Sequence, residues 1–209
     1  LGMLVACGGA LVGGARLAIA PARTADAFWS DVRRYGVTAV FYERALIELL
    51  LDAPARAGEE THPVRAFIGA GLDELAWGRF IERFGPARVL EFFATAWGNV
   101  CLANLTGEHP GALGRELPGL ANVEVVRWDR ARDVPVRGER GGLWRCAPGE
   151  AGRLIGRIVV GHPLFEPGGF LDEARTEARV LTGCFNARDR WFDMGAEVRR
   201  DAGGTFWRV

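Results

Sequence analysis

The sequence predicts an α/β fold in which a parallel sheet with βαβ crossovers is followed by a distorted antiparallel β-barrel. In the first half, short β-branched apolar runs alternate with amphipathic segments of helical spacing, which is typical of βαβ units. After Gly107, glycine and proline become frequent and helical periodicity fades, which favours antiparallel strands. We therefore expect an α/β parallel-sheet lobe over 1–115 and a β-rich, barrel-like lobe over 116–209.

The helices of the first lobe carry recognisable start and stop signals. Thr24 is expected to cap the helix over 25–35, Tyr35 to lie on its buried face and Gly36 to end it. In chain order we expect a helix over 1–11, a strand over 16–20, a helix over 25–35, a strand over 37–41, a helix over 43–51, a strand over 64–68, a helix over 73–84 and a strand over 88–92.

The second lobe is expected to contain strands and one short helix. Asp201 and the following glycines predict the turn of a hairpin near the end of the chain. The expected strands lie over 123–128, 152–160, 196–200 and 205–209, and the expected helix lies within 171–182.

Composition excludes several classes of function. The 26 basic residues balance the 26 acidic ones, so nothing indicates binding to nucleic acid. The chain has no lysine, and Ser30 is its single serine, which excludes a Schiff-base lysine, a P-loop lysine and a G-x-S-x-G nucleophile elbow. Its four cysteines are widely spaced and indicate reduced thiols in a cytoplasmic protein. The apolar opening, interrupted by glycines, predicts neither a signal peptide nor a membrane span, and we interpret the chain as an excerpt from a longer one.

Two stretches at predicted strand ends could bind a ligand. The run 68–72 reads Ile-Gly-Ala-Gly-Leu, and its glycines would let a flat ligand approach the backbone, although a tight strand-to-helix turn explains them as well. In the run 91–99, Phe93 could stack on a purine while Glu91 anchors the strand end or caps a neighbouring backbone group. A core aromatic pair beside a solvated carboxylate is the alternative.

The chain resembles the middle of an AMP-forming acyl-CoA synthetase of the adenylate-forming superfamily. It is most similar to the long- and very-long-chain type that is also called fatty acid transport proteins. The resemblance rests on an ordered series of segments, which are Phe28–Thr38, Val64–Leu72, Arg83–Gly85, Glu91–Asn99, Ala103–Leu105, Gly149–Gly152 and Asp201–Gly204.

The resemblance implies an activity and a set of site residues. Such enzymes join a carboxylate to ATP with Mg²⁺, giving an acyl-adenylate, and then transfer the acyl group to coenzyme A. Positions implied to contact the acyl chain are Phe41 and Tyr42. Positions implied to bind the nucleotide are Gly69, Ala70, Gly71, Leu72, Glu91, Phe93, Ala94 and Thr95. The family's phosphate loop and its lid with the catalytic lysine would lie outside this chain.

Three positions depart from the family pattern. Where the family has a threonine and the glutamate that helps to hold Mg²⁺, this chain has Ala96 and Trp97. Where the family has the aspartate that binds the ribose hydroxyls, it has Ala196. A one-residue shift of the alignment makes Thr95 the family threonine but places Ala96 at the glutamate, so no register restores the Mg²⁺ carboxylate. An indole supplies no oxygen ligand for a hard cation.

Two hypotheses of function follow. In the first, the chain is a fragment of a long-chain or very-long-chain fatty acid–CoA ligase-like protein that uses ATP, Mg²⁺ and coenzyme A on a fatty acid or other carboxylate. In the second, the parent is a catalytically impaired relative that binds an acyl chain or a nucleotide, or is a non-catalytic partner subunit. Peripheral membrane contact is an expectation by analogy with the family. A dinucleotide-binding oxidoreductase is excluded because no G-x-G-x-x-G follows a predicted strand.

Overall fold

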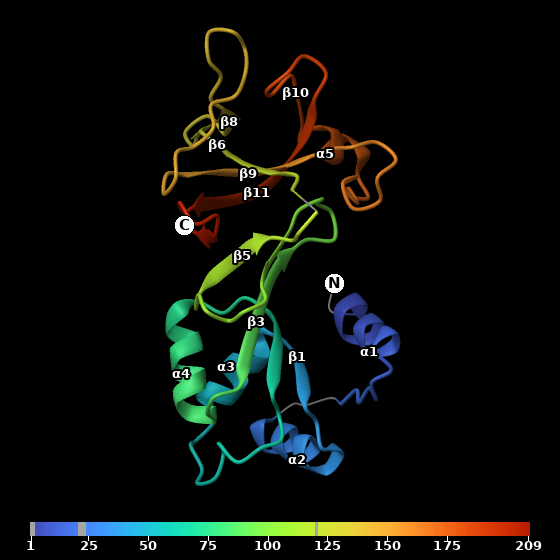
Figure 1. The fold of residues 1–209 in the computed structure, drawn as a ribbon, viewed down its shortest axis with the longest axis vertical. Coiled ribbons are helices and arrows are strands. Elements are labelled where there is room, and N and C mark those ends of the chain that lie inside the picture. The colour runs from blue at the N-terminus through green and yellow to red at the C-terminus, as the bar shows by residue number, and fades with distance from the viewer. Residues whose placement is uncertain (1–2, 21–23, 120) are drawn as a thin grey trace. The chain divides into compact units, whose positions relative to one another are not determined.

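The computed structural model describes residues 3–20, 24–119 and 121–209, and the chain divides into two compact units. The first unit comprises Leu1–Phe92 and Asn104–Ala112, and the second comprises Phe93–Ala103 and Leu113–Val209. Each unit has a hydrophobic core of its own. The elements are traced in Figure 1.

The first unit alternates helices and strands, as predicted. Its elements are η1 (Met3–Gly8), α1 (Gly9–Val12), α2 (Ala25–Tyr35), β1 (Ala39–Glu43), α3 (Arg44–Asp52), β2 (Ala66–Ala70), α4 (Glu74–Phe84) and β3 (Arg88–Ala94), whose last two residues belong to the second unit.

The two longer helices of this unit begin at side-chain caps. The backbone N–H of Ala27 donates to Thr24 Oγ1 at 3.2 Å, and that of Ala76 donates to Asp73 Oδ1 at 2.8 Å. Such caps satisfy backbone donors that have no partner inside the helix. Gly36 ends α2 with a left-handed φ of 59°. The cap at Thr24 and the stop at Gly36 are therefore confirmed.

Strands β1, β2 and β3 pair in parallel and set the first part of the candidate site. Tyr42 on β1 lies opposite Gly69 on β2, and Gly69 lies opposite Glu91 on β3. Since side chains alternate between the faces of a sheet, these three positions share one face. The predicted parallel sheet with helical crossovers is confirmed.

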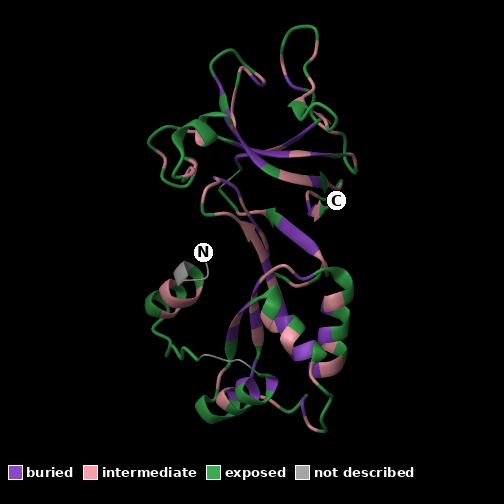
Figure 2. Ribbon diagram, turned by 180° about the vertical axis from the view of Figure 1, so that it is seen from behind, coloured by how far each residue is buried: buried purple, intermediate pink, exposed green. Residues whose placement is uncertain are grey.

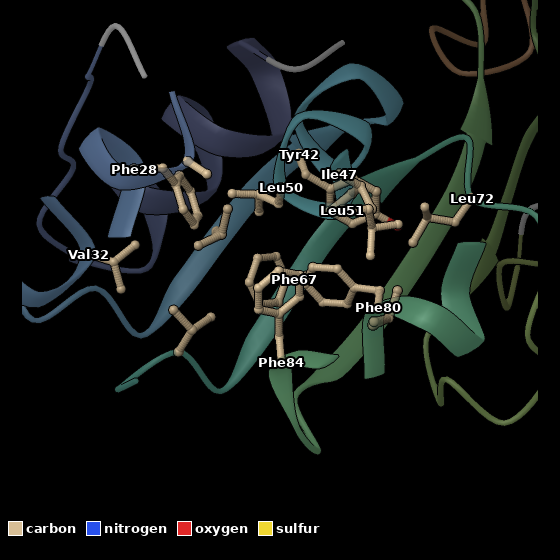
Figure 3. Close-up of a cluster of buried hydrophobic side chains, with 14 of the residues drawn as sticks. Phe28, Val32, Tyr42, Ile47, Leu50, Leu51, Phe67, Leu72, Phe80 and Phe84 are labelled. Atoms are coloured by element: carbon tan, nitrogen blue, oxygen red, sulfur yellow. The ribbon is translucent and has the colours of Figure 1, made fainter. Parts of the chain in front are cut away.

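The core of the first unit packs this face of the sheet against helices (Figure 3). The Phe67 ring lies 4.7 Å from the Phe80 ring, which lies 5.0 Å from that of Phe84. Full burial of one such side chain contributes about 1.5–3 kcal/mol. In Figure 2 buried and exposed positions alternate along the helices, as expected of amphipathic helices at a surface.

Two expectations for the first unit are wrong. Residues 16–20 form no strand, and Leu17 and Ile19 are 48% and 83% exposed. A strand needs a neighbour for its backbone hydrogen bonds, and no described strand pairs with this segment. Tyr35 is 56% exposed, whereas Trp29 of the same helix is only 4% exposed and packs 5.1 Å from Phe84.

The second unit is antiparallel. Its strands follow the order β4-β5-β12-β11-β9-β6, with β10 beside β11. Its elements are β4 (Cys101–Asn104), β5 (Ala112–Glu116), β6 (Val123–Val126), β7 (Trp128–Asp129), β8 (Val134–Pro135), β9 (Ala151–Arg157), α5 (Glu173–Glu177), β10 (Val180–Thr182), β11 (Arg190–Arg200) and β12 (Phe206–Arg208).

The hairpin of β11 and β12 is confirmed, with Asp201 at its turn. The carboxylate of Asp201 accepts the Thr205 N–H at 2.9 Å and the Trp207 Nε1–H at 2.9 Å. The helix expected within 171–182 is shorter than that range and gives way to β10. Across the described residues, no helix has both the length and the apolar character needed to cross a membrane.

Candidate functional site

In the first unit, the run 68–72, which was predicted to approach a ligand, contains a backbone turn that one carboxylate holds. Strand β2 ends at Ala70, and Gly71 adopts a φ of 106°, a conformation that favours glycine. Glu91 on β3, which is 4% exposed, accepts the Gly71 N–H through Oε2 at 2.9 Å and the Leu72 N–H through Oε1 at 3.0 Å. The expectation that Glu91 caps neighbouring backbone groups is confirmed.

Tyr42 completes this arrangement from β1. Its hydroxyl donates to Glu91 Oε1, and the residue is 1% exposed. Burial, together with the charge of Glu91 and this hydrogen bond, strongly raises the pKa of the Tyr42 phenol. The hydroxyl therefore stays protonated and keeps donating to the carboxylate.

Gly69 lacks a side chain for a reason that the sequence did not show. A Cβ at this position would clash with the Tyr42 carbonyl oxygen and would lie 2.7 Å from the Tyr42 ring. The glycine is therefore required by the neighbouring strand, whether or not a ligand also lies near it. Phe41, the other predicted acyl-binding residue, is half-buried, with its ring 6.1 Å from that of Phe92.

In the second unit, the chain turns sharply after Phe93 and Ala94. Thr95 Oγ1 accepts the Gly98 N–H at 3.0 Å, so the hydroxyl stabilises the turn. A Cβ at Gly168 would clash with the carbonyl oxygen of the exposed Ala96, which shows that the loop around Gly168 packs closely on this turn.

Trp97, which the sequence resemblance is expected to align with the family's Mg²⁺ glutamate, lies in an aromatic and cationic cluster. Its ring stacks on that of Phe170 with centroids 5.1 Å apart and an interplanar angle of 21°. The Arg179 guanidinium carbon lies 5.1 Å from the centre of the Trp97 ring and 5.6 Å from that of Phe170. On the Phe170 ring, the Arg175 guanidinium carbon lies at 4.2 Å.

Arg179 is held by Asp193 on β11, the strand that also carries Ala196. Its Nη1 donates to the Asp193 carbonyl oxygen at 3.2 Å and lies 3.6 Å from the Asp193 carboxylate. That carboxylate also lies 3.7 Å from Arg153 and accepts the Gly195 N–H at 2.8 Å. Burial nevertheless raises the pKa of Asp193, because desolvation outweighs the hydrogen bond and the two guanidinium groups.

Two residues from separate predictions line one pocket of the second unit. Phe93, predicted to stack on a purine, and Ala196, predicted to align with the family's ribose-binding aspartate, border a cavity of about 280 Å³. Its other lining residues are Leu113, Glu197, Val198, Arg208 and Val209. The cavity is a small, partly apolar space with no aspartate at position 196.

The donor set of this region does not fit a divalent cation. Among the described residues, no three His, Cys, Asp or Glu side chains gather in a group that could hold a metal. Trp97 offers no oxygen, and the nearby Asp193 carboxylate is engaged by Gly195, Arg153 and Arg179. A hard cation requires carboxylate, carbonyl or water oxygens. The indole and guanidinium groups of this cluster supply no oxygen.

Sequence reasoning missed Phe170, Arg175 and Arg179. They lie far along the chain from Trp97, in a loop and around a short helix, and no local motif marks them. The one available signal was indirect: the resemblance aligns an indole with a family carboxylate at position 97, and an indole needs different neighbours from a carboxylate.

Comparison with known proteins gives consistent findings. The family model described as AMP-binding enzyme matches residues 1–151. The chain is 30% identical over 210 residues to mouse long-chain fatty acid transport protein 5, covering 99% of this chain and 30% of that protein. It is 31% identical over 196 residues to rat long-chain fatty acid transport protein 2, covering 92% of this chain and 31% of that protein. It thus spans about a third of the length of these relatives.

Two solved structures show the same fold. ATP-bound MatB from Rhodopseudomonas palustris superposes with a TM-score of 0.74 at 19% identity, over 99% of this chain and 37% of that one. O-succinylbenzoate coenzyme A synthetase from Bacillus subtilis, in complex with ATP and magnesium ion, superposes with a TM-score of 0.63 at 17% identity, over 99% of this chain and 38% of that one.

Proposed function

Because the chain belongs to the AMP-binding enzyme family, we propose that it is part of a fatty acid–CoA ligase-like protein that binds a nucleotide or an acyl chain but has lost magnesium-dependent adenylation. In the intact reaction of this type, a carboxylate oxygen attacks the α-phosphorus of ATP and pyrophosphate leaves. The coenzyme A thiol then attacks the acyl carbonyl, and AMP leaves.

The observation that carries this proposal is the environment of Trp97. The stack with Phe170 at 5.1 Å and the nearby Arg179 occupy the place where the family resemblance puts a carboxylate. The metal in such reactions orients the phosphates and neutralises the charge that develops on the leaving pyrophosphate. Without that carboxylate the protein loses a ligand that would position the metal, and adenylation should slow strongly.

The pocket that contains Ala196 supports the same proposal. A methyl group there cannot accept hydrogen bonds from ribose hydroxyls, although Phe93 still provides a ring beside it. Loss of hydrogen bonds to a charged acceptor costs about 1.5–3 kcal/mol. Nucleotide affinity should therefore be about tenfold to a hundredfold weaker than in a relative that has the aspartate.

A working ligase is the second candidate, and the Glu91 arrangement favours it. The Glu91 carboxylate joins the Gly71 and Leu72 N–H groups and the Tyr42 hydroxyl in one set of hydrogen bonds. A scaffold kept in this order is compatible with a working site in which Mg²⁺ is held by phosphates and water. As a working ligase, the protein would act on a fatty acid or other carboxylate, use coenzyme A and make peripheral contact with a membrane.

The two candidates differ in pyrophosphate release. The full-length protein that contains this chain would be incubated with Mg·ATP and a panel of fatty acids, with an O-succinylbenzoate coenzyme A synthetase and its own substrate as the positive control. We expect no fatty-acid-dependent pyrophosphate above the protein-free rate. Release that depends on a fatty acid would support the ligase and overturn the proposal. Thermal shift with ATP, measured in parallel, reports whether nucleotide binding remains.

A further inference from the structure

We propose that Trp97, Phe170, Arg175 and Arg179 form a binding site for the phosphate groups of a nucleotide that operates without a divalent cation. We call this set the aromatic–arginine site. The choice of a nucleotide rests on the proposed function, whereas the site itself rests on the contacts of these four residues.

Arg179 is held in place before any ligand arrives. Its Nη1 donates to the Asp193 carbonyl oxygen, and its guanidinium carbon lies 5.1 Å from the centre of the Trp97 ring. A Cβ at Gly195, where φ is 65°, would lie 2.5 Å from Arg179 Nη1. Glycine at this position therefore gives the guanidinium the room it occupies.

The contacts of Arg179 leave hydrogen-bond donors for an anion. A guanidinium group carries five N–H donors, and the contacts with Asp193 involve only Nη1. Cation–π contact uses the face of the guanidinium plane and leaves its edge available. The Arg179 side chain is 28% exposed, so part of it reaches solvent.

The charges around Arg179 are paired, whereas Arg175 has no ion-pair partner among the described residues. Arg153 and Arg179 share the Asp193 carboxylate, and Arg153 also pairs with Asp133, so these two arginines face two carboxylates. The exposed Arg175 adds a further positive charge over the Phe170 ring.

The acidic residues of α5 do not cancel this charge by direct pairing. Within the described residues, neither Glu173 nor Glu177 is within ion-pair distance of Arg175 or Arg179. A phosphate at the site would therefore meet two guanidinium groups that have spare donors.

A site built from guanidinium groups in place of a carboxylate does not need a metal ion to hold a phosphate. A carboxylate holds a phosphate only through a bridging cation, since both groups are negative. A guanidinium binds phosphate oxygens directly, often through two parallel hydrogen bonds. Phosphate binding at the aromatic–arginine site should therefore persist when divalent cations are removed.

Isothermal titration of the full-length protein with inorganic tripolyphosphate tests the site. The titration is done in EDTA and again in excess Mg²⁺. We expect binding in EDTA, with a dissociation constant no larger than that measured in Mg²⁺. Arg179→Ala should weaken binding in EDTA about tenfold to a hundredfold, because charge-assisted hydrogen bonds are lost. Arg175→Ala, at an exposed position, should weaken it to a smaller extent.

The matched control is Arg190→Ala, which removes one exposed arginine of β11 outside the cluster. It should change the dissociation constant less than twofold. Arg179→Lys keeps the charge and loses the planar donor edge, so it should weaken binding severalfold even if the alanine variant does not fold. Binding that requires Mg²⁺, absence of tripolyphosphate binding, or equal losses in the Arg190 and Arg179 variants would overturn the proposal.

The result is separable from the proposed function. Fatty-acid-dependent pyrophosphate release would refute the loss of adenylation and leave metal-free tripolyphosphate binding unaffected. Failure of tripolyphosphate binding without pyrophosphate release would refute the aromatic–arginine site alone.

Discussion

Replacement of Glu91 by glutamine tests whether one carboxylate holds the turn at the end of β2. The amide oxygen of glutamine could take the place of Oε1 and still accept from Leu72 and Tyr42. The amide nitrogen would then face the Gly71 N–H, which now donates to Oε2 at 2.9 Å. Two donors would meet at a site that is 4% exposed.

The expected loss follows from that unpaired donor. A buried backbone N–H without a partner costs about 1–3 kcal/mol, and the two remaining bonds lose their charged acceptor. Urea unfolding of the protein should show this loss, and hydrogen exchange should accelerate at the amides of Gly71 and Leu72. Glu82→Gln, at an exposed position on α4, is the matched control and should change stability by less than about 0.5 kcal/mol.

Equal stability of the two glutamine variants, or unchanged hydrogen exchange at Gly71, would contradict this prediction. Either result would mean that the turn keeps its conformation without the Glu91 carboxylate.

Two further predictions concern the neighbours of Glu91, and a third concerns Trp97 and Ala196. Because the pKa of Tyr42 is raised above its ordinary value of 10.0, its stabilising contribution is complete below pH 10.0 and is lost as the pH rises further. Tyr42→Phe should remove that alkaline loss from urea midpoints measured across the range, and an unchanged profile would exclude Tyr42 as its source. Gly69→Ala should destabilise the protein by at least about 1–3 kcal/mol in urea unfolding, because the new Cβ overlaps the Tyr42 backbone, whereas a neutral effect would contradict the register. Trp97→Glu combined with Ala196→Asp should enlarge the ATP-dependent thermal shift and make it depend on Mg²⁺, and a shift unchanged from that of the unaltered protein would show that the roles assigned to these positions are wrong.

Much of the first unit could be predicted from the sequence because its signals are local. The cap at Thr24 and the stop at Gly36 mark the two ends of a helix directly. The strand expected over 16–20 failed for the opposite reason. Its pattern suits a strand, but strand formation depends on a pairing partner, which the local sequence does not specify.

The candidate site could be predicted only in part. Glu91 and the glycine turn stood out at a strand end, yet the reason for Gly69 lies in Tyr42 of the neighbouring strand. The change at Trp97 was visible in the sequence. Its partner Arg179 was not, since stacking between residues so distant in the chain leaves no periodic pattern.

We propose that Trp97 and its neighbours fill the metal-holding corner of an adenylate-forming site, so that adenylation is lost. Fatty-acid-dependent exchange between labelled pyrophosphate and ATP, catalysed by the full-length protein in Mg²⁺, measures reversible adenylate formation directly. We predict no exchange above the rate without fatty acid. Exchange that requires both the fatty acid and Mg²⁺ would contradict the claim.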